Sequence, residues 1–207
     1  MNTYDIREIV REKIAEEKRT NKLMSQIAAS AGKKAAAKAI NFIENYVSLT
    51  PDLMDKVYMA AQQQNLLIQF QPIFDVVFNY WSEEFDYIPD HLGLAGICDD
   101  AYMSLSLMNF IANTEVLGTG RSLLALDLRG MNNDMSVLLG PDITSQLDVT
   151  VNATYQSATI QNSLSALMNM VAGGVSFGTP FSGMQSMIDQ HRIEESVNTQ
   201  LGAMGIF

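Results

Sequence analysis

Four carboxylates surround a predicted turn near the middle of the chain. The stretch from Tyr80 to Tyr102 carries them within otherwise apolar sequence, at Asp86, Asp90, Asp99 and Asp100. Charge is costly in apolar surroundings, so these side chains are expected to pair, to cap helices, to bind a metal ion or to reach solvent. Oxygen ligands from two converging segments suit Mg²⁺ or Ca²⁺, and two close carboxylates can also serve as a catalytic acid and base.

Helix capping is the interpretation that needs no chemistry, and we prefer it. Asp90 follows Pro89, and Asp99 with Asp100 comes just before the apolar run that begins at Ala101. A carboxylate at a helix N-terminus accepts backbone hydrogen bonds and interacts favourably with the helix dipole, which contributes about 0.5–2 kcal/mol. The sequence therefore predicts caps, with a Mg²⁺ or Ca²⁺ site and a catalytic carboxylate pair as the alternatives.

Other reactive side chains are few. Cys98 is the single cysteine, which excludes an internal disulfide and a zinc site built from several cysteines. The carboxylates beside Cys98 are expected to raise the pKa of its thiol, and we interpret it as a buried structural residue. The two histidines, His91 and His191, lie far apart in the sequence. Because no nucleophile–histidine–acid order, zinc-protease motif or dinucleotide fingerprint is present, the sequence favours a protein that is not an enzyme.

Two apolar segments of helical length flank the acidic stretch. Residues 73–81 are apolar nearly all round, as expected of a central core helix, and residues 101–112 form a second segment of this kind. Together they predict a helical hairpin whose connection carries the carboxylates. Caps and apolar residues three or four positions apart recur through most of residues 5–125, so the fold class that we predict is all-α.

The hairpin segment resembles the YkvA-like family, small bacterial helical domains without an assigned activity. The residues that carry the resemblance are Tyr80, Asp86, Ile88, Pro89, Asp90, Gly96, Asp99 and Asp100. Two prolines of the family pattern are replaced here, by Glu84 and Gly93, and Tyr87 stands where the family prefers leucine. The resemblance covers residues 50–117 and implies a helical fold and this acidic site.

The N-terminal part of the chain is typical of a basic amphipathic helical arm. Residues 1–38 hold nine Lys or Arg against five Asp or Glu, and residues 39–207 hold four against eighteen, so a +4 arm precedes a −14 body. Opposite charges on arm and body can bring neighbouring copies together. Asp5 with Glu8 indicates a capping-box start. A narrow stripe rich in alanine follows and is expected to pack on a neighbour; its members are Met24, Ile27, Ala28, Ala31, Ala35, Ala39, Ile43 and Val47.

Three lysines of the arm lie off this stripe, at Lys33, Lys34 and Lys38. A solvated helix face is the ordinary interpretation of such residues, and contact with anionic lipid or phosphate is the alternative. After the arm, Thr50, Pro51 and Asp52 are typical of the start of a new helix, as N-cap, first-turn proline and first-turn carboxylate.

Residues 118–207 are polar, low in charge and interrupted by glycines. Residues 147–155 fit either a helix or a strand: their β-branched residues favour a strand, whereas the continuing periodicity favours the helix that we choose. No charged residue occurs between Val149 and Ile188, but Asn, Gln and Pro interrupt this stretch, so no transmembrane span is expected. The apolar residues 201–207 suggest docking into a partner or a neighbouring subunit.

We therefore divide the chain into a basic helical arm (1–48), a YkvA-like helical domain (50–117) and a C-terminal region (118–207). The function that we predict is a non-catalytic structural or interaction subunit of a larger assembly, such as a virion or a secretion-type particle, with protein partners and self-association. The alternatives are a membrane-peripheral adaptor that uses the basic arm and a metal-dependent enzyme that uses the Asp cluster. The acidic body argues against a nucleic-acid partner. No signal peptide is visible, so the expected location is cytoplasmic or virion-associated.

Overall fold

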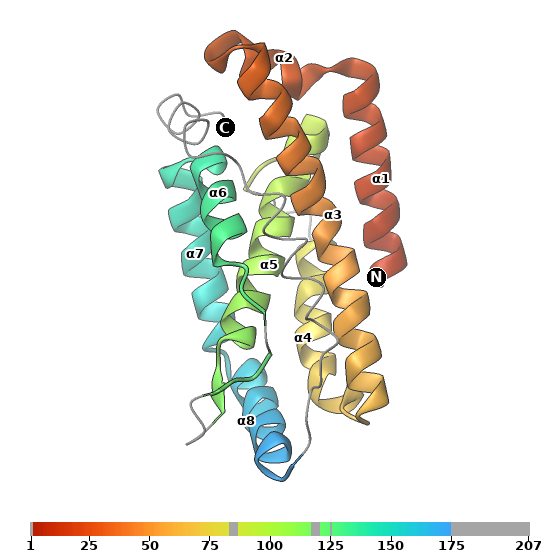
Figure 1. Cartoon of the computed structure of the whole chain (residues 1–207), viewed down its shortest axis with the longest axis vertical. Coiled ribbons are helices and arrows are strands. Elements are labelled where there is room, and N and C mark those ends of the chain that lie inside the picture. The colour runs from red at the N-terminus through yellow and green to blue at the C-terminus, as the bar shows by residue number, and fades with distance from the viewer. Residues whose placement is uncertain (1, 83–86, 117–120, 125, 175–207) are drawn as a thin grey trace.

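The computed structural model describes residues 2–82, 87–116, 121–124 and 126–174, and over these residues the protein is an all-α bundle (Figure 1). This confirms the predicted fold class. The helices are α1 (Thr3–Thr20), α2 (Lys22–Ala31), α3 (Lys33–Gln63), α4 (Leu67–Tyr80), the 3₁₀ segment η1 (Asp90–Ile97), α5 (Cys98–Ala112), α6 (Arg129–Leu139), α7 (Pro141–Tyr155) and α8 (Ala158–Ala172). One short antiparallel pair joins β1 (Glu115–Val116) to β2 (Arg121–Ser122).

The first helix begins one turn earlier than the sequence indicated. Asn2 is its N-cap: the Asn2 side chain accepts hydrogen bonds from the backbone N–H groups of Tyr4 and Asp5, at 2.8 and 3.3 Å. The Asp5 carboxylate in turn accepts from the Asn2 backbone N–H at 2.9 Å, which completes a capping box. The predicted box of Asp5 with Glu8 is therefore wrong, because Asp5 is already the third residue of the helix.

The alanine-rich stripe does not belong to one straight helix. Gly32 has φ +84° and ψ 157°, and the chain turns there, so α2 folds back against the start of α3. Positive φ strains residues that carry a side chain, which suits glycine to this position. Ala35, Ala36 and Ala39 are buried at 6% exposure or less within the protein's own core. The neighbour on which the stripe packs thus lies in the same chain.

The predicted helix start at Thr50 is also wrong. Pro51 lies inside α3, which continues unbroken from Lys33 to Gln63. A proline within a helix removes one backbone hydrogen bond and crowds the preceding turn. The helix nevertheless continues, because Leu49, Leu53 and Met54 around the proline are buried in the core. The boundary that we placed between residues 48 and 50 falls in the middle of this helix.

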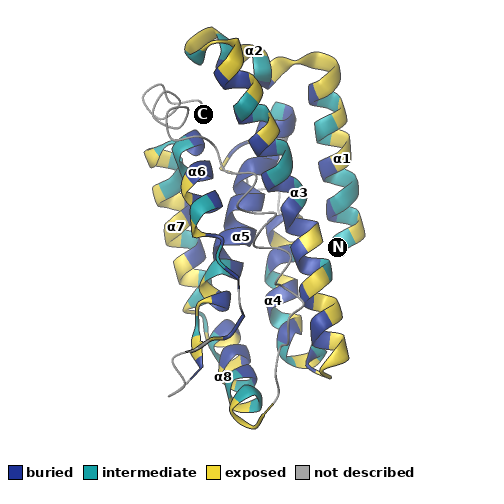
Figure 2. Ribbon diagram, viewed as in Figure 1, coloured by how far each residue is buried: buried dark blue, intermediate teal, exposed yellow. Residues whose placement is uncertain are grey.

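Helix α5 lies at the centre of the molecule (Figure 2). It packs against α3, α4, α6, α7 and η1, and thirteen of its fifteen residues are buried. The predicted pair of apolar helices on either side of the acidic stretch corresponds to α4 and α5. Pro72 lies inside α4 near its N-terminal end, where it neither interrupts the helix nor starts a new one.

Helices α6 and α7 cover α5 from the side opposite α1, and α8 packs mainly against α4 (Figure 1). Residues 147–155 lie in α7, which confirms the helix prediction for this ambiguous segment. Leu147 and Val151 are fully buried, whereas Val149 is 70% exposed. A strand would have placed these three residues on one face; the spacing of four between the two buried residues is helical. In the described part of the chain, no helix is long and apolar enough to span a membrane.

One buried carboxylate joins the first two helices. Glu17 of α1 is only 5% exposed, and its two oxygens accept hydrogen bonds from the backbone N–H groups of Leu23 and Met24, at 3.0 and 2.9 Å. These donors belong to the first turn of α2, where helical partners are missing. Asn21, the N-cap of α2, makes no side-chain capping bond. Glu17 therefore performs the capping from a neighbouring helix.

We expect Glu17→Ala to lower the free energy of unfolding by about 1–2 kcal/mol, because two backbone donors lose their acceptor. Glu17→Gln keeps one carbonyl acceptor and is expected to lose less. Urea denaturation followed by circular dichroism measures both changes. Glu12→Ala, an exposed carboxylate on the same helix, serves as the control; an equal loss at Glu12 and Glu17 would contradict the capping role.

Candidate functional site

The acidic turn lies between α4 and α5 and is covered by α1, which packs on η1. Gly93 within the turn has φ +74° and ψ −128°. Proline is held near φ −65° and cannot adopt this conformation. Gly93 stands where the YkvA-like pattern has proline, so the turn differs here from any that a proline would form. A Cβ atom added at Gly93 would lie 3.8 Å from the carboxyl group of Glu16 on α1, which shows how closely α1 covers the turn.

Asp99 connects the two ends of the turn. Its side chain is fully buried, and its Oδ2 accepts a hydrogen bond from the backbone N–H of Ile88 at 2.9 Å. The N-cap of α5 is Ile97, which makes no side-chain capping bond. The role that we predicted for Asp99 thus takes a different form: the carboxylate stands in the first turn of α5, where the helix dipole favours it, and holds the segment before η1.

The rest of the acidic cluster is described only in part. Asp100 also lies in the first turn of α5 and is 4% exposed. Asp86 lies outside the described residues, and for Asp90 the structure describes the backbone at the start of η1. Among the described side chains, no group of three His, Cys, Asp or Glu residues is placed to hold a metal ion. A Mg²⁺ or Ca²⁺ site that includes Asp86 and Asp90 stays a prediction.

Cys98 is the structural thiol that the sequence indicated. Its side chain is fully buried and its Sγ donates to the Leu94 carbonyl oxygen at 3.4 Å. Burial raises the pKa of the Cys98 thiol, and the negative charges of Asp99 and Asp100 raise it further. The thiol therefore stays protonated and unreactive at neutral pH.

A set of polar side chains, all of them buried except Asp148, links helices across the core. Tyr46 of α3 donates from its hydroxyl to Asn132 Oδ1 of α6 at 2.9 Å, and Asn132 Nδ2 donates to Ser106 Oγ of α5 at 3.3 Å. Tyr102, one turn before Ser106, donates to Asp148 Oδ1 of α7 at 2.9 Å. These bonds join four helices. The partners are 86, 26 and 46 residues apart in the sequence, so no local motif could have indicated them.

Tyr46 and Tyr102, the two tyrosines of this set of polar side chains, are held in the neutral form. Burial raises the pKa of Tyr46 well above its ordinary value, with smaller contributions from Tyr102 and Cys98 nearby. Burial also raises the pKa of Tyr102, and the hydrogen bond to the Asp148 carboxylate adds to this, while a hydrogen bond from Ser106 acts the other way. Protonated hydroxyls can donate, so each tyrosine serves as a fixed donor between helices.

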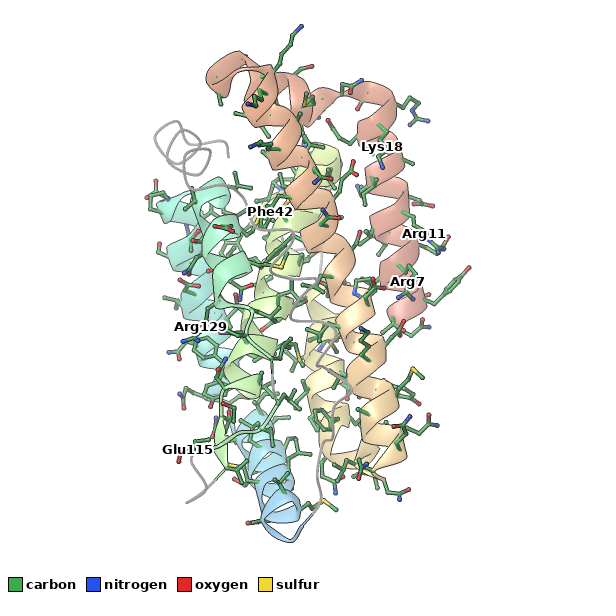
Figure 3. The ribbon with its side chains drawn as sticks, in the orientation of Figure 1. Arg7, Arg11, Lys18, Phe42, Glu115 and Arg129 are labelled. Carbon is green, nitrogen blue, oxygen red and sulfur yellow. The ribbon has the colours of Figure 1, made fainter. Side chains whose placement is uncertain are left out.

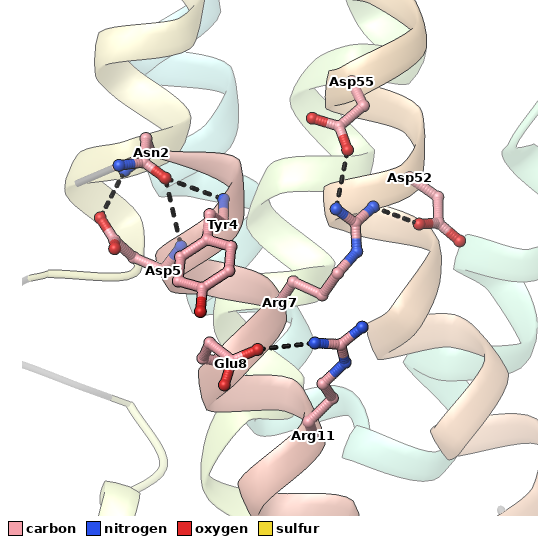
Figure 4. A network of polar contacts seen from close by, with 8 residues as sticks. All are labelled: Asn2, Tyr4, Asp5, Arg7, Glu8, Arg11, Asp52 and Asp55. Carbon is pink, nitrogen blue, oxygen red and sulfur yellow. Dashed lines mark hydrogen bonds and ion pairs between the residues drawn. The ribbon is translucent and has the colours of Figure 1, made fainter.

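The basic arm is bound to the acidic body of its own chain. Arg7 donates to Asp52 at 2.6 Å and to Asp55 at 2.8 Å, both on α3 (Figure 4). These hydrogen bonds, the one to Asp52 first, raise the pKa of Arg7. Further along α1, Lys18, which is labelled in Figure 3, pairs with Glu44 of α3 at 3.1 Å. These partly exposed pairs contribute about 0–1 kcal/mol each, but they show that arm and body complement each other within one molecule.

The three lysines named from the sequence do not form one group. Lys33 and Lys34 lie in the first turn of α3 and are exposed, whereas Lys38 is half-buried one turn later and has a side-chain interaction of its own. Arg19 and Lys22, at the turn between α1 and α2, are also exposed. Within the described part of the chain, Arg19, Lys22, Lys33 and Lys34 make no ion pair, and the sequence analysis missed the first two.

A cleft of about 250 Å³ opens where α1, α2 and α3 meet. Its apolar wall includes Met24 and Ile40, and its polar groups include Glu17 and Glu44. Glu17 caps α2 and Glu44 pairs with Lys18, so both carboxylates already serve the packing of these helices.

No family model matches the chain, and no curated protein or solved structure is similar to it. The resemblance to the YkvA-like family therefore stays a prediction that rests on residues 80–102.

We expect Asp99→Ala to lower the free energy of unfolding by about 1–3 kcal/mol, because the buried Ile88 N–H would lose its acceptor. Asp99→Asn keeps an acceptor oxygen and should cost less. Thermal and chemical unfolding measure the difference. Asp142→Ala is the control, since Asp142 is also a first-turn carboxylate but is exposed in α7, and a loss of only a few tenths of a kcal/mol is expected there.

The same variants test the cation site. If Mg²⁺ or Ca²⁺ raises the melting temperature of the native protein but not that of Asp99→Asn, the result would indicate that Asp99 binds the cation. It would contradict a purely structural role for Asp99.

Proposed function

We propose that the protein is a non-catalytic interaction subunit that associates with protein partners in a larger assembly. The observation that carries this proposal is the composition of the outer surface of α7 and α8. From Val149 to residue 174 the chain has no Asp, Glu, Lys, Arg or His, and Val149 is 70% exposed. The charged residues of α7 and α8 are Asp142 and Asp148, both exposed in α7. The whole chain has a net charge of −10. A surface with so few charges on so acidic a protein is one where a partner can approach with little electrostatic repulsion.

The roles of the buried polar residues support the same proposal. The Asp99 carboxylate, the Tyr46 and Tyr102 hydroxyls and the Cys98 thiol all make hydrogen bonds that join elements of the fold. Their burial keeps them from solvent, and α1 packs over the acidic turn. The arrangement favours a structural use of these groups over a metal-dependent reaction at the Asp cluster.

The means of association differ from those that the sequence indicated. The alanine stripe packs against the protein's own core. Basic residues of the arm pair with Asp52, Asp55 and Glu44 of α3 in the same chain. The tail at residues 201–207 lies outside the described residues. The proposal therefore rests on the weakly charged surface of α7 and α8, and no longer on attraction between the arm of one copy and the body of another.

We expect the full-length protein to form oligomers whose association is strengthened by salt. Salt screens the repulsion between two acidic bodies but has little effect on an uncharged contact. Light scattering coupled to size exclusion, from low to high ionic strength, tests this. Oligomers that dissociate as salt is added would instead indicate attraction between arm and body. A monomer at about 100 µM under all salt conditions would contradict self-association, since this concentration populates even complexes with micromolar affinity.

A second candidate function, a membrane-peripheral adaptor, is supported by the four exposed cations at the two ends of α2. Basic residues near an anionic membrane surface contribute about 1 kcal/mol each, and salt screens this attraction. Arg19, Lys22, Lys33 and Lys34 would supply this contact.

Cosedimentation with vesicles rich in phosphatidylserine tests this candidate. We expect salt-sensitive binding that the double replacement Lys33→Gln with Lys34→Gln weakens. Lys56→Gln is the control, because Lys56 is exposed toward the other end of α3. Binding that both variants leave unchanged would remove the electrostatic contact.

A further inference from the structure

The outer face of α7 has a symmetrical pattern of residues about its exposed valine. Val149 lies at the middle of this face and is 70% exposed. Residues three, four and seven positions away lie on the same side of a helix. In α7 these positions, and Gln156 just after the helix, are all exposed; they are Asp142, Ser145, Gln146, Asn152, Ala153 and Gln156.

We propose that two copies of the chain associate through α7, with the two helices antiparallel and crossing at Val149. This inference rests on the proposed function as an interaction subunit and names both the partner, a second copy, and the surface. In such an isologous contact each residue meets its counterpart on the other side of the two-fold axis. Val149 then lies opposite Val149, Ser145 opposite Ala153 and Gln146 opposite Asn152.

Charge selects the antiparallel arrangement. Asp142 is the one ionisable residue of the face, at its N-terminal end, and Gln156 lies equally far from Val149 at the other end. In the antiparallel pair the Asp142 carboxylate faces the Gln156 amide of the second copy, which can donate a hydrogen bond. In a parallel pair the two Asp142 carboxylates would face each other and repel. The face thus complements itself in one orientation only.

The shape of the face suits close helix packing. Ser145 and Ala153 on either side of Val149 are small, so the helix axes can approach to the usual 8–10 Å. The fifteen residues of α7 extend over about 22 Å, which is a small contact by the standard of stable complexes. We therefore expect reversible dimers with a dissociation constant in the micromolar range.

Ile68, the most exposed of the large apolar residues that the structure describes, lacks this symmetry. Ile68 of α4 is 84% exposed, and Gln71 and Asp75 on the same side of the helix are hydrogen-bonded to each other at 2.7 Å. A single exposed apolar side chain is ordinary on a protein surface. Ile68 provides the matched control for Val149.

Sedimentation equilibrium on the full-length protein tests the surface. Val149→Glu places two carboxylates against each other at the axis, and we expect it to raise the dissociation constant at least about tenfold. Ile68→Glu adds the same charge elsewhere and should leave association near that of the native protein. Circular dichroism checks that both variants fold. If the native protein associates and Val149→Glu has no effect, α7 is not the contact although the interaction function stands. If the native protein does not associate, both the α7 dimer and self-association as part of the proposed function are contradicted.

A charge replacement and a cross-link test the orientation. Gln156→Lys would face Asp142 of the second copy in the antiparallel pair, so association should tighten; in a parallel pair it would face another lysine and association should weaken. Val149→Cys should form a disulfide-linked dimer on mild oxidation, whereas Ile68→Cys should not, and the native Cys98 is too buried to interfere. A weaker Gln156→Lys dimer, or equal cross-linking of the two cysteine variants, would overturn the antiparallel contact.

Discussion

Burial of thirteen of the fifteen residues of α5 is the constraint on which the rest of the structure depends. A helix enclosed in this way cannot leave its polar side chains to water, so each one needs a partner on an adjacent element. Asp99 accepts from Ile88, Ser104 from the Trp81 indole, and Asn109 from the Leu128 N–H. Ser106 accepts from Asn132. These bonds reach three segments, so the position of α5 fixes the C-terminal end of α4, the acidic turn and the start of α6.

The same constraint explains which predictions from the sequence were confirmed. A helix that is buried all round is apolar nearly all round, and this made α4 and α5 recognisable from composition alone. The helical spacing of Leu147 and Val151 identified α7 despite its β-branched residues. The position of Cys98 in an apolar turn beside two carboxylates was enough to infer a buried, protonated thiol. Each of these inferences depended on neighbours within a few residues.

Apart from the capping box of α1, where Asn2 was overlooked, the features that the sequence did not predict depend on residues distant in the sequence. Pro51 has every local feature of a helix start, and only the core packing of the residues around it keeps α3 continuous. Glu17 caps a helix other than its own, and Asp99 bonds across the turn and not at the N-cap of α5. No sequence pattern predicts the hydrogen bond between Tyr46 and Asn132, because it forms only when α3 and α6 pack together. Local patterns therefore predicted the elements of this fold and left their connections open.

The hydrogen bond between Tyr46 and Asn132 has a consequence for synthesis on the ribosome. The two residues are separated by 86 positions, which at about 5–20 residues per second corresponds to roughly 4–17 s of translation. Helices α1, α2 and α3 can pair as soon as they emerge, since Glu17, Lys18 and Arg7 find their partners among the first 55 residues. The inner face of α3 must wait for α5 and α6. During that interval a newly made chain exposes the side of α3 that carries Tyr46 to other nascent chains and to chaperones, before its own core can cover it.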